Sequence, residues 1–151
     1  MISISKKTDY ALLALTHLAL SDEGQPIPAR DIAGEYEIPA ELLAKILQKL
    51  ARSGLLKSSP GPTGGYTLAR PAETITIGAV LEAVEGTPAL AHCMRGHHSD
   101  CEQVTRCTIR RPLERINARV LTMLDDVPLS DFVRDLGKVR TSSPAIRAIR
   151  T

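Results

Sequence analysis

Aromatic residues are scarce in this chain of 151 residues, where they make up only 3% and where Phe132 is the single phenylalanine. Because tryptophan is absent as well, the core is expected to consist of Leu, Ile, Val and Ala, which suits packed helices better than a β-sandwich. No apolar run approaches about 18 residues, so a transmembrane helix is excluded. The first residues lack a basic region followed by an apolar stretch, so we expect a cytoplasmic protein with no membrane partner.

Cysteine is also rare, with three residues in the whole sequence. An odd number of cysteines in a cytoplasmic chain indicates free thiols rather than a disulfide framework. The formal net charge is only +2, which by itself indicates no particular partner. Within residues 38–70, however, five basic residues stand against Glu41 alone, which indicates either a surface that binds phosphate or a solvated helix face.

The spacing of apolar residues predicts three helices in the first third of the chain. Thr8 or Asp9 is the expected cap of the first helix, and Pro28 lies near the first turn of the second. The third helix is expected from Pro39 to Arg52, with Gly54 supplying a left-handed cap after it.

A hairpin and three more helices are predicted after this point. Strands are expected at residues 55–58 and 66–69, on either side of a loop rich in Gly and Pro. Helices should follow at 77–85 and at 129–136, with a long helix between them that needs either a partner helix or its own domain to pack against. The apolar stripe of the long helix consists of Ile109, Leu113, Ile116, Val120, Leu124 and Val127.

The predicted fold is mainly α with a small β-hairpin wing, which is a winged helix-turn-helix with a long additional helix. We expect four regions: a winged helix-turn-helix at residues 1–86, a cysteine-bearing loop at 87–107, a long dimerisation helix with a short final helix at 108–137, and a basic tail at 138–151.

In a winged helix-turn-helix the third helix enters the major groove of DNA, while the hairpin reaches the backbone or the minor groove. The adjacent Gly64 and Gly65 favour this reading over a plain protein-interaction module, because glycine lets a backbone lie close to phosphate. The outward face of the third helix and the wing give the candidate DNA contacts Ala40, Glu41, Ala44, Lys45, Gln48, Lys49, Lys57, Ser59, Thr63, Gly64, Gly65 and Tyr66.

The three cysteines are candidate metal ligands, because thiolates favour iron–sulfur clusters, zinc or copper(I). Cys93, Cys101 and Cys107 are separated by seven and then five residues, so all three could turn toward one centre. A helix starting near Thr108 would point its positive end at this loop and favour thiolates. Thiol-only redox sensing and a structural zinc site remain alternatives. The zinc site would add one of His92, His97 and His98.

Four stretches and the cysteines together resemble the IscR/NsrR-type family of winged-helix bacterial transcription factors. The stretches are Ile4–Leu15, Ile38–Leu55, Gly61–Leu68 and Ile77–Gly86. The resemblance implies a homodimer joined by the long helix, which binds double-stranded DNA at a pseudo-palindromic operator. It also implies an iron–sulfur cluster, [4Fe-4S] or [2Fe-2S], that controls DNA affinity in response to iron, redox or nitric oxide status.

The resemblance further implies a fourth cluster ligand. Some relatives carry a histidine three positions after the last cysteine, where this chain has Arg110, which cannot ligate. Asp9 matches an aspartate that nitric-oxide-sensing relatives supply from the partner subunit, with His97 or His98 as the next candidates. An enzyme is not expected, because the sequence has no nucleophile–His–acid set and no Gly-rich nucleotide loop after a strand. The alternatives are a zinc-stabilised protein-interaction module and a thiol-only redox-sensing regulator.

Overall fold

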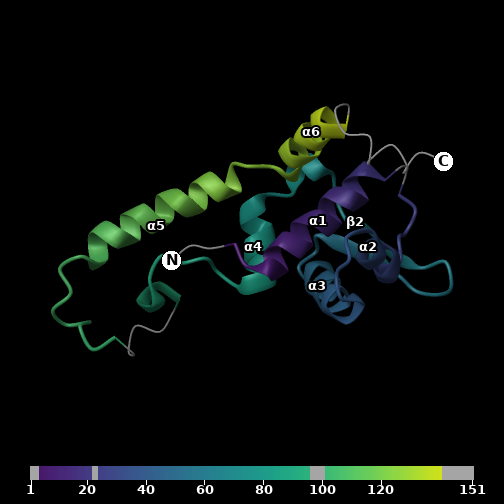
Figure 1. The fold of residues 1–151 in the computed structure, drawn as a ribbon. Helices are drawn as coiled ribbons and strands as arrows, with labels where there is room; N and C mark the ends of the chain where they lie inside the picture. Colours follow the sequence, from purple (N-terminus) through teal and green to yellow (C-terminus); the bar gives the residue numbers. More distant parts are fainter. Residues whose placement is uncertain (1–3, 22–23, 96–100, 141–151) are drawn as a thin grey trace.

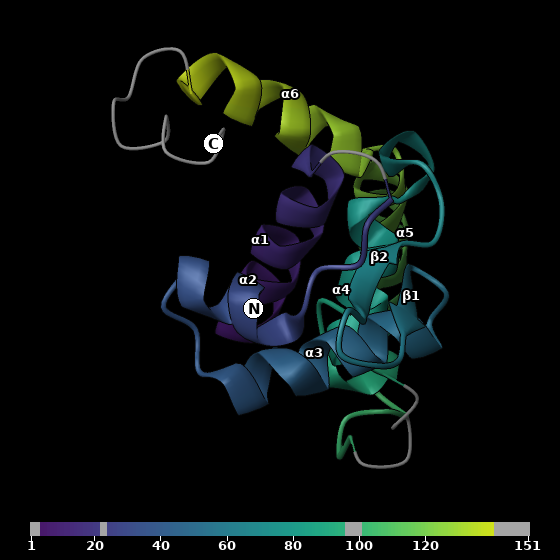
Figure 2. The same cartoon turned by 90° about the vertical axis from the view of Figure 1, so that its right-hand side faces the viewer.

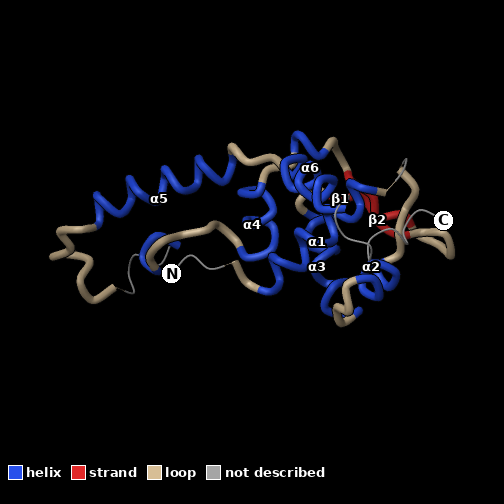
Figure 3. Tube along the Cα trace, turned by 45° about the horizontal axis from the view of Figure 1, so that its top comes forward, coloured by secondary structure: helices blue, strands red, loops and turns tan. Residues whose placement is uncertain are grey.

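The computed structural model describes residues 4–21, 24–95 and 101–140, and Figures 1 and 3 show the arrangement of its elements. In chain order these are α1 (Lys6–Leu20), α2 (Ala29–Glu35), α3 (Ala40–Arg52), β1 (Leu56–Ser59), β2 (Gly65–Leu68), η1 (Ala72–Thr74), α4 (Ile77–Glu85), η2 (His92–Arg95), α5 (Arg110–Asp125) and α6 (Leu129–Arg140). The mainly α fold with a two-stranded wing is confirmed.

Helix α1 begins earlier than the sequence predicted. Ser5 is its cap, with extended backbone angles and a side chain that accepts a hydrogen bond from the Thr8 amide at 3.4 Å. Thr8 is fully buried and Asp9 is an exposed residue of the first turn, so the expectation that one of them caps the helix is wrong. A carboxylate in the first turn is still favourable there, because it lies near the positive end of the helix dipole.

Helix α3 ends as its glycine predicted. Gly54 adopts the left-handed conformation, with φ of 75°. The Leu55 amide donates to the Leu50 carbonyl at 3.0 Å, and the Gly54 amide donates to the Ala51 carbonyl. This pair of bonds is the Schellman motif, which satisfies carbonyls that the helix itself leaves free.

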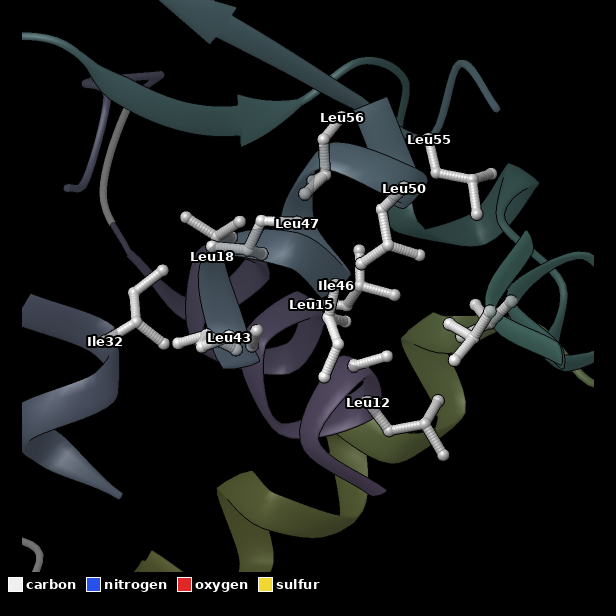
Figure 4. Packing of buried hydrophobic residues seen from close by; sticks show 14 of the residues in the cluster. Leu12, Leu15, Leu18, Ile32, Leu43, Ile46, Leu47, Leu50, Leu55 and Leu56 are labelled. Atoms are coloured by element: carbon white, nitrogen blue, oxygen red, sulfur yellow. The ribbon is translucent and has the colours of Figure 1, made fainter. Parts of the chain in front are cut away.

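The core is aliphatic, as the composition predicted. Among the described residues the buried hydrophobic side chains are Leu, Ile, Val and Ala, with no aromatic residue among them. Figure 4 shows Leu15 of α1 lying against α3, whose Leu43, Leu47 and Leu50 are fully buried. Burial of one such leucine stabilises the fold by about 1.5–3 kcal/mol.

The wing is an antiparallel hairpin that a third segment extends. Leu56 pairs with Leu68 and Ser59 with Gly65, within one residue of the predicted strands. Ile27 adds a bridge to the outer side of β2, because its amide and carbonyl bond the carbonyl and amide of Tyr66 at 3.0 and 2.9 Å. The wing is therefore fixed to the segment that precedes α2.

Close packing within the chain, rather than a ligand, accounts for the two wing glycines. A Cβ on Gly64 would lie 2.1 Å from the Ser59 carbonyl oxygen, and one on Gly65 would lie 2.3 Å from the Ile27 backbone. The Gly64 amide is also already donated to the Gly61 carbonyl at 3.0 Å. The glycine pair thus has a reason within the chain itself, and its contact with phosphate stays a prediction.

Helix α5 projects away from the body that α1–α4 form, and its start lies far from that body (Figure 1). Leu124 and Val127 pack against the core at its other end, whereas Ile109 and Ile116 are 60% and 50% exposed. The long predicted stripe is thus divided: its last part covers the chain's own core and its first part is uncovered.

Helix α6 continues beyond its predicted end at Leu136 to Arg140. Gly137 does not stop it, because glycine weakens a helix by about 1 kcal/mol without removing a hydrogen-bond donor as proline does. Residues 141–151 of the predicted basic tail lie outside the described residues, as do His97 and His98. No helix in the described part of the chain is long and apolar enough to cross a membrane.

Candidate DNA interface and cysteine site

A sharp turn sets the angle between α2 and α3. Glu37 has a positive φ of 52°, and the Ile38 amide bonds the Ala33 carbonyl at 2.9 Å. Ile38 is buried, so the turn is held to the core by an apolar anchor. The short helix, tight turn and longer helix of the prediction are confirmed.

Helix α3 presents a polar face to solvent opposite its buried leucines. Figure 2 shows this helix at the edge of the molecule, with the hairpin close to it. Among the predicted contacts of α3 only Ala44 is half-buried. The exposed ones are Ala40, Glu41, Lys45, Gln48 and Lys49.

Lys49 differs from the other exposed residues of this face because its ammonium is engaged within the chain. Its Nζ donates to the Val84 carbonyl at the end of α4 over 2.9 Å. Lys45, one turn earlier on the same side of α3, has no hydrogen bond or ion pair with any described residue. The two lysines thus have different surroundings, a difference that the helical pattern alone does not predict.

The predicted DNA contacts of the wing differ in their exposure to solvent. Lys57 and Thr63 are exposed, Ser59 and Tyr66 are half-buried, and Gly64 is buried. The exposed tip is formed by residues 60–63. Side chains available to a ligand therefore come from the strand and the tip, not from the glycine pair.

The three cysteines are free thiols and each is half-buried. Within the described residues no three His, Cys, Asp or Glu side chains converge closely enough to hold a metal ion, so the predicted gathering of three thiols is not seen in one chain. Cys93 and Cys107, from the two ends of the cysteine segment, nevertheless lie near Arg110 at the start of α5. The pKa of the Arg110 guanidinium is raised, mainly by its hydrogen bond to Glu114 and by the charge of that carboxylate, with smaller electrostatic contributions from Cys93 and Cys107.

The chemistry of this donor set fits a metal–thiolate group. Three free, half-buried thiols on one short segment are ligands that suit iron or zinc. The Arg110 Nε also donates to Glu114 at 2.9 Å, one turn further along α5. That ion pair holds the guanidinium at the helix start.

Asp9 forms no metal-binding group with the cysteines within the described chain. Its carboxylate is exposed and makes no hydrogen bond or ion pair with another described residue. The neighbouring Thr8 hydroxyl donates instead to Glu85 Oε1 at 2.5 Å, which joins the start of α1 to the end of α4. Sequence reasoning missed this contact because 77 residues separate its partners and no pattern connects them.

Three helices with a tight turn, a paired hairpin and a polar recognition face define a winged helix-turn-helix, the class of protein that binds duplex DNA. Comparison with known proteins agrees. A model of the Rrf2 family, described as an iron-dependent transcriptional regulator, matches residues 4–135. The chain therefore belongs to the Rrf2 family, and it is a transcriptional regulator rather than an enzyme.

Individual relatives cover almost the whole chain. The regulator NsrR of Geobacillus kaustophilus is 33% identical over 93% of this chain and 95% of its own length. The regulator IscR of Vibrio atlanticus is 30% identical over 89% of this chain and 76% of its own. The solved structure of CymR, described as the global cysteine regulator of B. subtilis, is 29% identical with a TM-score of 0.67, over 89% of this chain and 98% of its own. The resemblance inferred from the sequence motifs is confirmed.

Proposed function

We propose that the protein is a homodimeric, cytoplasmic regulator whose affinity for a pseudo-palindromic operator depends on an iron–sulfur cluster bound by Cys93, Cys101 and Cys107. The observation that carries this proposal is the presence of three half-buried free thiols on one segment, residues 93–107, in a chain that matches a family described as iron-dependent transcriptional regulators. Similarity to IscR and NsrR supports the same conclusion.

The bound cluster would supply an iron centre that responds to iron supply, oxygen or nitric oxide. The protein residues have separate tasks. The three thiolates bind, Arg110 balances their charge, and Asp9 of the partner subunit serves as the fourth ligand. Because Asp9 lies in the first turn of α1, such a ligand would connect the cysteine segment of one copy to the DNA-binding head of the other.

Dimer formation would use the uncovered part of α5. No residue of α5 is buried, and its exposed apolar side chains include Ile109, Ile116 and Met123. An isolated helix of about this length is marginal in water unless its apolar face packs. A second copy of the same helix offers a complementary stripe and places two heads for two half-sites.

DNA contact would come from α3 and the wing. Glu41 and Lys45 are suited to base edges, since carboxylates accept from cytosine and lysines donate to guanine. Lys57 and Thr63 of the wing would contact phosphate, which fixes the orientation of the head without reading sequence.

The test begins with protein purified without oxygen and reconstituted with ferrous iron and sulfide. Iron and sulfide are counted per chain and the visible absorption is recorded. We expect bound iron, bound sulfide and a visible chromophore, all reduced by Cys93→Ser, Cys101→Ser or Cys107→Ser. A colourless protein without iron would contradict the cluster.

DNA binding is measured in parallel. A duplex is selected by the reconstituted protein from a random pool of about 30 base pairs, and its affinity is compared between the reconstituted and the iron-free protein. We expect the two forms to differ in affinity by about tenfold or more, as typical coupling free energies give.

A second candidate is regulation by the thiols alone, without a cluster. It is supported by the similarity to CymR, described as a cysteine regulator, and by the absence of a three-residue metal group among the described residues. It predicts a protein that stays iron-free after reconstitution. Its DNA affinity would change when diamide oxidises thiols to a disulfide and return when dithiothreitol reduces that disulfide.

A further inference from the structure

The last turn of α4 leaves backbone carbonyls without a helical donor, and the Val84 carbonyl is one of them. Gly86 donates its amide to the Glu82 carbonyl at 2.9 Å, but the residue four positions after Val84 is Pro88, which has no N–H. Lys49 Nζ fills this place by donating to the Val84 carbonyl at 2.9 Å. A cation is doubly suited to this position, because the helix dipole makes the C-terminal end of α4 negative.

The same turn joins three parts of the molecule, and we call residues Val84, Glu85 and Gly86 the α4 end. Lys49 bonds it from the recognition helix α3. Thr8, fully buried in α1, bonds it through Glu85. The chain then leaves α4 at Gly86, with φ of 84°, and continues to Cys93.

The segment beyond the α4 end is in turn fixed to the long helix. The Leu90 amide donates to the Asn117 side chain of α5 at 2.9 Å. A displacement of the cysteine segment therefore acts on the α4 end from one side, while Lys49 holds the recognition helix to it from the other.

We propose that Lys49 is a positioning residue, which holds α3 to the α4 end and sets the placement of the recognition helix, and that it does not neutralise a DNA phosphate. This proposal rests on the proposed function for the step from the cysteines to DNA. Lys45 serves as the matched control, because it lies one turn earlier on the same side of α3 with its ammonium free of described partners.

The dependence of DNA affinity on salt separates the two roles. A lysine that neutralises a phosphate contributes about 0.9 to the slope of log K against log salt for each chain bound. The variants Lys49→Met and Lys49→Gln remove the ammonium. With the selected duplex we expect both to weaken binding about three- to tenfold while the slope stays at its wild-type value. Lys57→Met, which removes the exposed wing ammonium assigned to phosphate, is the comparison and should lower the slope by about 0.9.

A double-mutant cycle tests the connection to the cysteines. If the cysteine segment acts on the recognition helix through Lys49, the effects of Lys49→Met and Cys107→Ser on DNA affinity should not be independent. The fold-change in affinity of the double variant should then differ from the product of the two single fold-changes. For Lys45→Met combined with Cys107→Ser, the fold-change in affinity of the double variant should equal the product of the two single fold-changes. Circular dichroism and urea unfolding confirm that each variant is folded.

Two results would overturn the proposal: a fall in slope of about 0.9 per chain for the Lys49 variants, or unchanged affinity in both of them. Failure of the proposed function would give a different result. In that case Cys107→Ser binds the duplex as the wild type does, while the salt slope of the Lys49 variants still decides the role of Lys49.

Discussion

At the scale of single residues, Glu85 shows how a charged group can be stabilised at an unfavourable place. A carboxylate at the C-terminal end of α4 opposes the dipole of that helix. Hydrogen bonds from Ser5 and Thr8 nevertheless lower the pKa of Glu85 below its ordinary value of 4.5, because both donors lie at the N-terminal end of α1. The carboxylate therefore favours the docked position of α1.

A lowered pKa in the folded state makes this contribution depend on pH. It is complete above the unfolded-state pKa, near 4.5, and it is lost as the pH falls through the folded-state value. We expect Glu85→Gln to lower the free energy of unfolding at pH 7 by less than about 1 kcal/mol, since the side chain is largely exposed. The difference between wild type and variant should shrink as the pH falls below about 4.5 toward 3.

Urea unfolding at the two pH values measures this difference. Glu82→Gln, an exposed change on the same helix, is the control and should shift the free energy of unfolding by less than about 0.5 kcal/mol at both. An equal loss at both pH values for Glu85→Gln would show that charge is not involved.

The wing glycines give a second prediction at this scale. Gly64→Ala should destabilise the protein by about 1–3 kcal/mol, because its Cβ would overlap the Ser59 carbonyl. Gly34→Ala should instead stabilise it by about 0.5–1 kcal/mol, since a Cβ on this helical glycine meets nothing within 4 Å. Thermal unfolding of both variants measures these changes. A higher Tm for Gly64→Ala than for the wild type would show that its Cβ does not overlap the Ser59 carbonyl.

At the scale of elements, α5 is held at one end and free at the other. The Ile77 amide bonds the Val127 carbonyl at 2.9 Å, and the Leu129 amide bonds the Ile75 carbonyl at 2.7 Å. These bonds fix the junction of α5 and α6 to the start of α4. Between its first residue and Leu124, α5 carries an apolar stripe that no other part of the described chain covers.

If a second copy covers this stripe, a charge placed on it should separate the dimer. We expect Ile116→Glu to give a monomer in analytical ultracentrifugation while circular dichroism of the head is retained, because burial of an unpaired carboxylate costs several kcal/mol. Thr122 lies about 120° around the helix from Ile116 and outside the apolar stripe, so Thr122→Glu should leave the dimer intact. A dimer that persists with Ile116→Glu would place the interface elsewhere.

At the scale of the whole molecule, the proposed control requires residues from two copies. Asp9 has no described partner in its own chain, and the described cysteines do not form a metal group by themselves. A site completed across the dimer would make DNA affinity depend on assembly and cluster together, which neither head could achieve alone.

Asp9→Ala tests this arrangement. Iron retention under air and the affinity difference between reconstituted and iron-free protein should both fall, while the iron-free affinity for the selected duplex stays unchanged. Asp31→Ala, an exposed aspartate on α2, is the control and should alter neither. If Asp9→Ala behaves as the wild type, the fourth ligand lies elsewhere, and His97 and His98 would be substituted next.

Much of the fold could be predicted from local chemistry. Gly54 as a helix cap, the hairpin around a Gly- and Pro-rich loop, and the bounds of α4 all depend on residues close in sequence. The cap of α1 was misplaced, because Ser5, Thr8 and Asp9 are all good caps and only burial distinguishes them. For the candidate site, the polar face of α3 followed from periodicity, but the engagement of Lys49 did not.

The sequence by itself determined the aliphatic core, the order of helices and hairpin, the family and the positions of three thiols. Those features follow from composition, short-range periodicity and motifs, which need no knowledge of distant contacts. The tertiary structure alone decided that Thr8 meets Glu85 and that Lys49 meets the end of α4. The reason is physical: each contact joins residues at least 35 positions apart, so only the packing of whole elements brings them together.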